Sequence, residues 1–389
     1  RMCHLTKKNE RTKIKCSASL AILFIFAIRN KFESFVMKKQ DVIISRNLEQ
    51  SLEEAIARCP HDRLFILTDE TTQTQCWPVI SNFTCLQKAQ HITIRPTDDH
   101  KDLESLAHVW SELGRLGGTR HSLLINLGGG MVTDLGGFAA STFKRGIAYI
   151  NIPTTLLAMV DASVGGKTGI NFNGLKNEVG VFNPASTVIL DTEFLKTLDR
   201  ANLCSGYAEM LKHGLISNEE NWNELLRFDL DNVDYKKLQD MVATSVAIKE
   251  RVVEEDPFEQ GIRKALNLGH TAGHALESLA MKEERTVLHG YAVAWGLVCE
   301  LYLSTLKAGF PKEKMRQAIY YIKEYYGTFP FTCKEYDQIY ELMTHDKKNT
   351  SGHINFTLLG EVGDIRINQT AEKEDIFQML DFYREVMGC

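Results

Sequence analysis

The sequence predicts an α/β domain followed by a mainly helical domain, and three observations support this expectation. Between residues 37 and 194, short apolar runs alternate with amphipathic stretches, which is typical of a parallel sheet with helices packed on it. Beyond about residue 195, strand signals almost vanish until residues 354–359. Within that helical stretch, residues 263–274 place polar side chains at helical spacing among apolar ones. Because buried polar groups need partners, this pattern indicates a functional site in the second domain.

The chain of 389 residues is long enough for two such domains, and we expect them at residues 37–194 and 195–389. Residues 1–36 read differently, because they hold an apolar run that is too short to span a bilayer and resembles the core of a signal peptide. No convincing cleavage site follows that run. We therefore expect Met37 to be the natural start and residues 1–36 to be a non-native or disordered extension, with secretion as the alternative.

Composition narrows the range of partners and compartments. The net charge is −5, and the lysines and arginines are scattered along the chain, so nucleic acid is not an expected partner. Nowhere else does an apolar run approach membrane length, so we expect no membrane partner. The nine cysteines are odd in number and form no C-x-x-C pair, which indicates neither a thiolate zinc site nor a disulfide framework. A reducing cytoplasm is the expected location.

Strands of the first domain are predicted from apolar runs bounded by turn residues. In chain order they are residues 64–69, 91–94, 122–127, 148–153 and 188–191. A helix is predicted at 102–116 from its apolar spacing, and one late strand is predicted at 354–359.

The glycine cluster after the third of these strands predicts a phosphate-binding turn. Gly128-Gly129-Gly130 opens what reads as a helix, where small residues let backbone N–H groups approach a phosphate, as in Rossmann-like dinucleotide-binding domains. The cluster is not G-x-G-x-x-G, and a tight packing turn is an equal alternative. Asp69 ends an earlier strand and suits either a ribose hydroxyl or a helix cap.

A second glycine-rich segment follows the next strand and points to an anionic, hydroxylated ligand. It contains Asp161, two glycines and Lys167, but it lacks the first glycine of a P-loop. Lys176-Asn177 comes shortly afterwards, across a turn predicted at Asn173-Gly174.

Histidines in the second domain predict a metal site. If residues 263–274 form one helix, Arg263, Asn267, His270 and His274 share one face. The glutamate of H-E-x-x-H is missing, which argues against a zincin protease. Two histidines and a carboxylate still suit Zn²⁺ with an open position for substrate.

A separate helical segment offers that carboxylate. Glu209, Lys212 and His213 share one face, which by itself reads as a solvated surface. Together with His270, His274 and His289, Glu209 makes four candidate ligands, one more than a catalytic zinc site needs.

The order of these motifs resembles that of the 3-dehydroquinate synthases of the shikimate pathway, which are sugar-phosphate cyclases. The resemblance covers about residues 40 to 385. It is carried by Gly128-Gly129-Gly130-x-x-x-Asp134, Arg145-Gly146, Pro153-Thr154-Thr155, Asp161-x-Ser163-Val164-Gly165-Gly166-Lys167, Lys176-Asn177, Glu209-x-x-Lys212, Lys249, Arg263-x-x-x-Asn267-x-Gly269-His270-x-x-Gly273-His274, His289-Gly290 and Asp346-Lys347-Lys348.

The resemblance implies a role for each matched residue. Zinc, which Co²⁺ could replace, would be held by Glu209, His270 and His289, and His274 would be left for substrate or proton transfer. NAD would lie near Asp69, Asp98, Lys101, Gly129, Gly130, Thr133, Asp134, Thr154, Thr155, Lys167, Lys176 and Thr197. Substrate contacts or catalytic roles would fall to Arg145, Asp161, Lys167, Lys176, Asn177, Lys212, Lys249, Arg263, Asn267, His274, Lys347 and Lys348. Thr97-Asp98 departs from the family's Gly-Glu but keeps a carboxylate.

The implied reaction converts the sugar-acid phosphate 3-deoxy-D-arabino-heptulosonate 7-phosphate into 3-dehydroquinate and phosphate. NAD is reduced and reoxidised in each turnover, and the family suggests a homodimer. The many matched cations suit a substrate that carries both a phosphate and a carboxylate. They argue against a polyol dehydrogenase of the glycerol-dehydrogenase type. A cyclase that makes an inosose or a valiolone is a second rival interpretation, and a non-catalytic protein on the same scaffold is a third.

Overall fold

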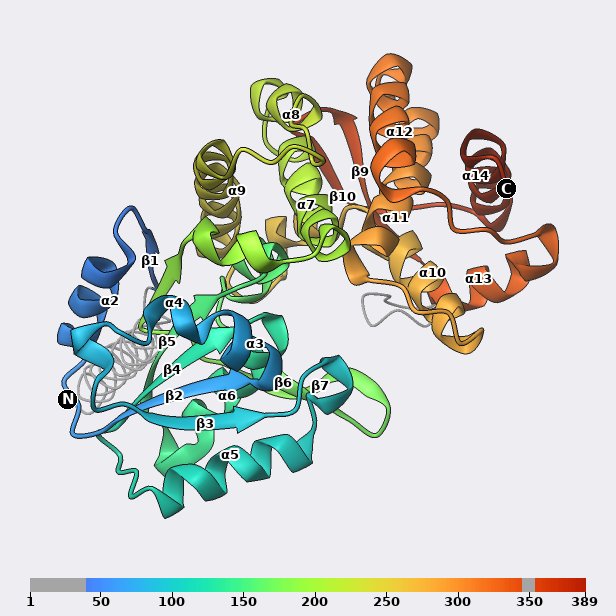
Figure 1. The fold of residues 1–389 in the computed structure, drawn as a ribbon. Helices are drawn as coiled ribbons and strands as arrows, with labels where there is room; N and C mark the ends of the chain where they lie inside the picture. The colour runs from blue at the N-terminus through green and yellow to red at the C-terminus, as the bar shows by residue number, and fades with distance from the viewer. Residues whose placement is uncertain (1–39, 345–353) are drawn as a thin grey trace, which may run out of the picture. The chain divides into compact units, whose positions relative to one another are not determined.

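The computed structural model describes residues 40–344 and 354–389 (Figure 1). Three expectations therefore lie outside the described residues: the start at Met37, the extension at 1–36, and the substrate contacts of Lys347 and Lys348. All statements below concern the described parts of the chain.

Six strands form a parallel sheet in the order β1-β8-β5-β4-β2-β3. They are β1 (Asp41–Ile44), β2 (Leu64–Asp69), β3 (Gln90–Ile94), β4 (Leu123–Gly128), β5 (Ala148–Pro153) and β8 (Thr187–Leu190). Strands β2 and β4 are buried at every residue, which explains why they read as continuous apolar runs. The five predicted strands are confirmed within one or two residues at each end, and β1 is additional.

The direction in which successive strands join the sheet reverses between β2 and β4. The chain runs from β2 outward to β3 and then returns to the other side of β2 to form β4. In open parallel sheets, ligands bind beyond the carboxyl ends of the strands at such a reversal. Asp69 ends β2 and the 128–130 turn follows β4, so both lie at this edge.

Helices connect and cover the strands. They are α2 (Leu48–Ala57), α3 (Glu70–Gln75), α4 (Trp77–Ile80), α5 (Leu103–Arg115) and α6 (Gly130–Thr142). Helix α5 confirms the prediction at 102–116, and the Asp102 side chain caps it by accepting from the N–H of Ser105 at 2.8 Å. Helix α6 packs very closely on β4, because a Cβ at Gly136 would come within 2.1 Å of Asn126 Oδ1.

An antiparallel hairpin extends from this domain (Figure 1). It consists of β6 (Lys167–Phe172) and β7 (Leu175–Phe182). Asn173 and Gly174 have φ values of 50° and 76°, as a tight hairpin turn requires, so the predicted turn is confirmed. The strands themselves were not expected. The hairpin carries Lys176 and Asn177 directly after its turn.

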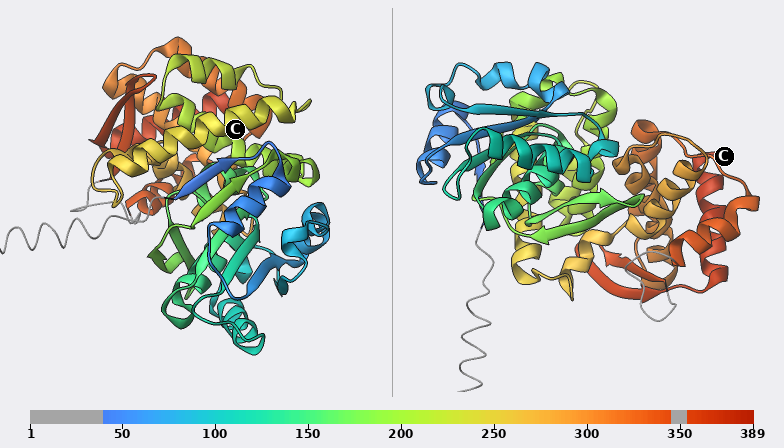
Figure 2. Two further views of the ribbon diagram at one scale, coloured as in Figure 1. Left: turned by 90° about the vertical axis from the view of Figure 1, so that its left-hand side faces the viewer. Right: turned by 90° about the horizontal axis from the view of Figure 1, so that it is seen from below.

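The remainder of the chain is mainly helical, as expected (Figure 2). Its helices are α7 (Arg200–Leu215), α8 (Glu219–Leu226), α9 (Tyr235–Glu255), α10 (His270–Lys282), α11 (His289–Leu303), α12 (Lys312–Tyr326), α13 (Tyr336–Thr344) and α14 (Lys373–Met387). An antiparallel pair, β9 (Asn355–Glu361) and β10 (Asp364–Thr370), contains the predicted late strand.

The expectation of one helix through residues 263–274 is wrong. Arg263 and Asn267 lie in a 3₁₀-helix, Ile262–Asn267, and α10 starts only at His270. Gly269 separates the two with φ of 80°, a left-handed conformation that glycine adopts without strain. His270 and His274 therefore share a helix, whereas Arg263 and Asn267 reach the site from a separate segment.

Residues Gln40–Cys389 form one compact unit, so the division at residue 194 stays a prediction. None of the helices in the described residues is long and apolar enough to cross a membrane. Every cysteine in the described parts is a free thiol, and Cys299 is fully buried, as its apolar surroundings predict.

Candidate active site and metal centre

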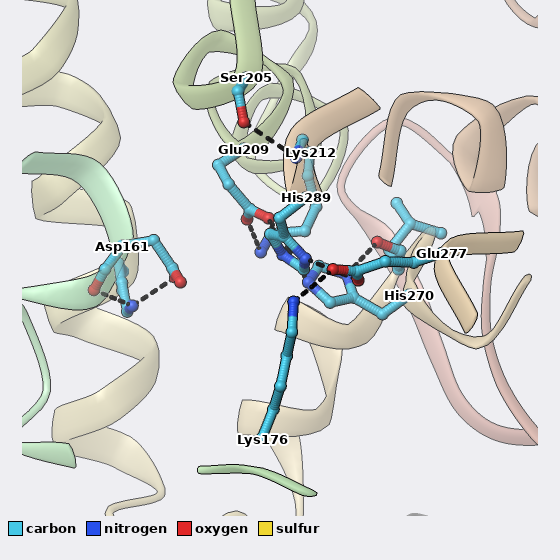
Figure 3. Close-up of polar contacts among 11 residues, drawn as sticks. Asp161, Lys176, Ser205, Glu209, Lys212, His270, Glu277 and His289 are labelled. Carbon is cyan, nitrogen blue, oxygen red and sulfur yellow. Dashed lines mark hydrogen bonds and ion pairs between the residues drawn. The ribbon is translucent and has the colours of Figure 1, made fainter. Parts of the chain in front are cut away.

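Three side chains from three helices converge on one place (Figure 3). Glu209 comes from α7, His270 opens α10 and His289 opens α11. Glu209 Oε1 lies 3.4 Å from His270 Nε2 and 3.5 Å from His289 Nε2. The side chain of Glu209 is fully buried, which is the opposite of the solvated face that its own segment suggests.

This arrangement fits a divalent metal. Glu209 Oε1 is buried yet has no hydrogen-bond partner among the described residues. Ligand atoms around a tetrahedral Zn²⁺ with bonds of about 2.1 Å stand about 3.4 Å apart. The two measured separations match that spacing, so a single ion between these atoms would satisfy the unpaired oxygen.

His274 belongs to the same cluster. Its ring centroid lies 5.3 Å from that of His270 and 5.9 Å from that of His289. One nitrogen from each of the three histidines lies within 4.8 Å of the others. The geometry thus gathers all four candidate ligands, and the choice of three among them stays a prediction.

A further carboxylate orients His289. Glu277 on α10 approaches His289 Nδ1 at 3.3 Å and accepts from Lys176 Nζ at 2.9 Å (Figure 3). Burial disfavours the charged imidazole, but the hydrogen bonds to Glu209 and Glu277 outweigh it and raise the pKa of His289 to about 10. A carboxylate behind a metal-binding histidine is a common supporting arrangement. Glu277 was not predicted, although it stands three residues after His274 on the same helical face.

Lys212 and Glu209 form a buried ion pair on α7. The ammonium donates to Glu209 Oε2, which leaves Oε1 directed toward the histidines. Burial would raise the pKa of Glu209, but Lys212 and His270 hold it well below its usual range. Glu209 is therefore anionic at neutral pH, as a carboxylate ligand of a metal would need to be.

His213 lies behind this pair and is fully buried. Its Nδ1 lies 2.7 Å from Ser245 Oγ. Burial and the neighbouring Lys212 lower the pKa of His213 to about 3, so the imidazole is neutral.

A second ion pair, between the buried Lys249 and the partly exposed Asp161, links the two parts of the sequence. Lys249 on α9 donates to both the carbonyl and the carboxylate of Asp161, with 2.6 Å to the carbonyl oxygen. Burial would raise the pKa of Asp161, but Lys249 outweighs it and lowers that pKa. Carboxylate oxygens of Asp161 and Glu209 and a His213 nitrogen lie within 4.8 Å of one another. The Asp161–Lys249 pair therefore borders the metal cluster.

Arg263 and Asn267 lie next to a carboxylate that was not expected. Glu259 accepts from Lys167 Nζ at 2.7 Å and from Asn267 Nδ2 at 2.9 Å. The guanidinium of Arg263 donates to the carbonyl of Pro257 at 2.6 Å and is almost fully buried. These contacts bring residues from three separate segments to one place.

The glycine turn has the close packing that its composition predicts. A Cβ at Gly129 would lie 3.0 Å from Thr155 Cγ2, and one at Gly130 would lie 3.3 Å from Ala162 Cβ. Thr133 and Thr154 are buried beside the turn. Gly129 is the N-cap of α6, so its helix N-terminus faces the carboxyl edge of the sheet.

Lys101 organises the next group. Its ammonium donates to Asp134 Oδ2 at 3.0 Å and to Asn177 Oδ1 at 2.5 Å, and Asp98 lies 3.7 Å away. Burial raises the pKa of Asp134 to about 6, and Lys101 offsets part of that effect. Asp98 and Lys101, both expected near NAD, are thus neighbours.

Two of the remaining expected residues, Asp69 and Thr197, lie near the Cys76 thiol, which also contacts Thr154 beside the glycine turn, whereas Arg145 stands apart. Asp69 caps α3 by accepting from the N–H of Thr72 at 2.7 Å, which is the helix-cap interpretation. The hydroxyl of Thr197 donates to the Phe194 carbonyl. Arg145 is exposed, and within residues 40–344 and 354–389 no hydrogen bond or ion pair joins it to the other candidates.

Two solved structures of synthases share this fold. A 2-deoxy-scyllo-inosose synthase complexed with carbaglucose-6-phosphate, NAD⁺ and Co²⁺ aligns with a TM-score of 0.75 at 23% identity, over 88% of this chain and 96% of that chain. ValA, a 2-epi-5-epi-valiolone synthase from Streptomyces hygroscopicus with NAD⁺ and Zn²⁺ bound, aligns with a TM-score of 0.75 at 23% identity, over 89% and 97%. The chain therefore shares its fold with these two synthases.

Sequence comparison gives the family. Family models described as 3-dehydroquinate synthase N-terminal and 3-dehydroquinate synthase C-terminal match residues 91–205 and 206–349. A 3-dehydroquinate synthase of Parabacteroides distasonis is 57% identical over 352 residues, which cover 90% of this chain and 100% of that protein. The chain belongs to the 3-dehydroquinate synthase family, as its motifs indicate.

Proposed function

We propose that this protein is a 3-dehydroquinate synthase, a lyase of aromatic amino-acid biosynthesis that uses NAD and a divalent metal. It converts 3-deoxy-D-arabino-heptulosonate 7-phosphate into 3-dehydroquinate and phosphate. The observation that carries this proposal is the convergence of Glu209, His270 and His289 at metal-ligand spacing, in a chain of this family.

When bound, the cofactor would supply a reversible hydride acceptor and the metal would supply a Lewis acid for the alcohol that is oxidised. Glu209, His270 and His289 would hold the metal. The glycine turn, Thr154 and Thr155 would hold the cofactor.

The chain's cations bind the two anionic groups of the substrate. Lys249, Lys212 and Arg263 are buried around Asp161 and the metal cluster, and Lys167 adds a charge at the rim. Arginine and lysine in a partly desolvated cleft suit phosphate and carboxylate together. A small uncharged diol would not need so many converging cations, so a polyol dehydrogenase is disfavoured.

Hydroxyl groups and protons fall to the neutral and anionic side chains. Asp161 and Asn267 would orient ring hydroxyls, and His274 would transfer a proton beside the metal. Asn177 and Lys176 reach the site from the hairpin, where Lys176 contacts Glu277. Arg145, Lys347 and Lys348 are proposed substrate contacts from the family resemblance alone. We also propose a two-domain homodimer in the cytoplasm.

One assay tests the proposal. Purified protein receives the sugar-acid phosphate with NAD⁺ far below the substrate concentration, with and without a chelator, and inorganic phosphate and product are followed. We expect many turnovers per NAD⁺ and loss of activity with the chelator. Net NADH formation would indicate a polyol dehydrogenase, and an inosose or valiolone product from another sugar phosphate would indicate a different cyclase.

A further inference from the structure

Glu300 is a buried carboxylate that joins two of the helices of the metal cluster. It lies on α11, and its side chain is fully buried. Its Oε2 accepts from the backbone N–H of Gly269 at 2.6 Å, and its Oε1 accepts from that of Ala272 at 3.0 Å. Both donors belong to the first turn of α10, which begins with His270.

These two hydrogen bonds replace the side-chain N-cap that α10 lacks. The N-cap of α10 is Gly269, which has no side chain to satisfy the N–H groups that every helix N-terminus leaves unpaired. In a capping box, one side chain bonds the N3 amide and another bonds the N-cap amide. Glu300 does both from a neighbouring helix, and its negative charge suits the positive end of the helix dipole. Two charge-assisted bonds offset the desolvation of the carboxylate.

Close backbone contacts restrict the movement of α10 relative to α11 around the Glu300 hydrogen bonds. A Cβ at Gly296 would lie 1.9 Å from the carbonyl oxygen of Gly269, and one at Gly273 would lie 2.8 Å from that of Ala292. Helices α10 and α11 therefore touch at backbone level close to the Glu300 bonds. A shift of either helix would have to break those bonds or separate the backbones.

We propose that Glu300 is a positioning residue of the metal centre. Helix α11 provides His289 at its first residue, and through Glu300 it also fixes the first turn of the helix that provides His270. The carboxylate bonds backbone amides of that turn, so it acts by setting the distance between His270 and His289. This inference rests on the proposed function, because it requires that these histidines bind a metal.

The test compares metal affinity with fold stability in two matched variants. Glu300→Gln keeps the size of the side chain but turns an NH₂ group toward a backbone N–H. Asp234→Asn makes the same chemical change at a cap that accepts two N–H bonds on α9, a helix with no expected metal ligand. For each protein, the dissociation constants of Zn²⁺ and Co²⁺ are measured by chelator competition. Unfolding of the metal-free protein and the visible spectrum of bound Co²⁺ are recorded as well.

We expect Glu300→Gln to weaken metal binding by about 10- to 100-fold, the usual effect of losing support behind a ligand, and to change the Co²⁺ spectrum. Asp234→Asn should leave both unchanged even where it lowers stability. At saturating metal, Glu300→Gln should recover most of its kcat. Metal binding within about twofold of the unaltered protein would show that Glu300 is only a structural cap, and the proposed function would stand. An unaltered protein that binds no divalent ion would overturn both proposals.

A second measurement needs no variant and covers the case in which Glu300→Gln fails to fold. In the metal-free protein, the amide hydrogens of Gly269 and Ala272 should already exchange slowly, because Glu300 holds them before any metal binds. Exchange at the rate of an open loop until metal is added would contradict the inference.

Discussion

Asp134 gives a quantitative prediction, because its buried carboxylate opposes folding at neutral pH. Its pKa of about 6 lies above the reference value of 3.8, since burial outweighs the contact with Lys101. A raised carboxyl pKa means that the group favours the fold when protonated. That contribution is present below about pH 4 and is lost as the pH rises through 6. A difference of about two pH units corresponds to about 3 kcal/mol, and we expect about 2–3 kcal/mol because the side chain keeps 18% exposure.

Asp134→Asn imitates the protonated carboxyl group. Without cofactor, the variant should therefore be more stable than the unaltered protein at pH 8 by about 2–3 kcal/mol. The advantage should shrink toward zero by about pH 4. Urea unfolding between pH 4.5 and 8 measures both quantities. Asp62→Asn is a control of opposite sign, because the hydroxyl of Thr119 lowers the pKa of Asp62 and its loss should destabilise the protein at neutral pH. An Asp134→Asn variant that is equally or less stable at pH 8, or whose advantage does not depend on pH, would refute the reasoning.

Three further predictions concern the site and its scaffold. Glu277→Gln should weaken Zn²⁺ binding about 10- to 100-fold in a competition titration. Glu283→Gln, at the exposed end of the same helix, should leave Zn²⁺ binding unchanged. Equal Zn²⁺ affinities of the two variants would contradict the supporting role of Glu277. Arg263→Ala and Lys249→Ala should each lower kcat/KM by an amount equivalent to about 2–4 kcal/mol in a phosphate-release assay, and near-normal values in both would exclude them as a phosphate clamp. Gly296→Ala should destabilise the protein by at least about 2 kcal/mol in thermal unfolding, because the new methyl group would overlap a backbone carbonyl; an unchanged midpoint would mean that α10 and α11 are not in backbone contact.

The sheet was predictable because its strands are buried on both faces. Strands β2 and β4 are mostly apolar and end in an acid or in glycines, a local signal that needs no knowledge of distant contacts. The hairpin β6–β7 escaped prediction because β7 is exposed at almost every residue, so it has no apolar periodicity. Only its turn, Asn173-Gly174, carried a signal.

The site was partly predictable for a related reason. Residue type marks a histidine or lysine as a candidate, but burial and partners come from elsewhere in the chain. Glu209 reads as a surface residue from its own helix, but it is buried, and two of its partners, His270 and His289, come from other helices. Glu277 and Glu300 carry no local motif, since each acts on a residue of another segment. Residues 263, 267, 270 and 274 have helical spacing, but the left-handed backbone at Gly269 interrupts the segment, so they do not lie on one helix.

The glycines between the helices also bear on how this scaffold could diverge. A Cβ at Gly290 would lie 1.8 Å from the Ser205 carbonyl oxygen, so α11 touches α7 as closely as Gly296 brings it to α10. Substitution of the glycines at these helix contacts is excluded, because every other residue is larger and would overlap a backbone carbonyl. The helices that carry Glu209, His270 and His289 are thus in backbone contact with one another, so a side chain added at either glycine would push apart helices that carry candidate ligands.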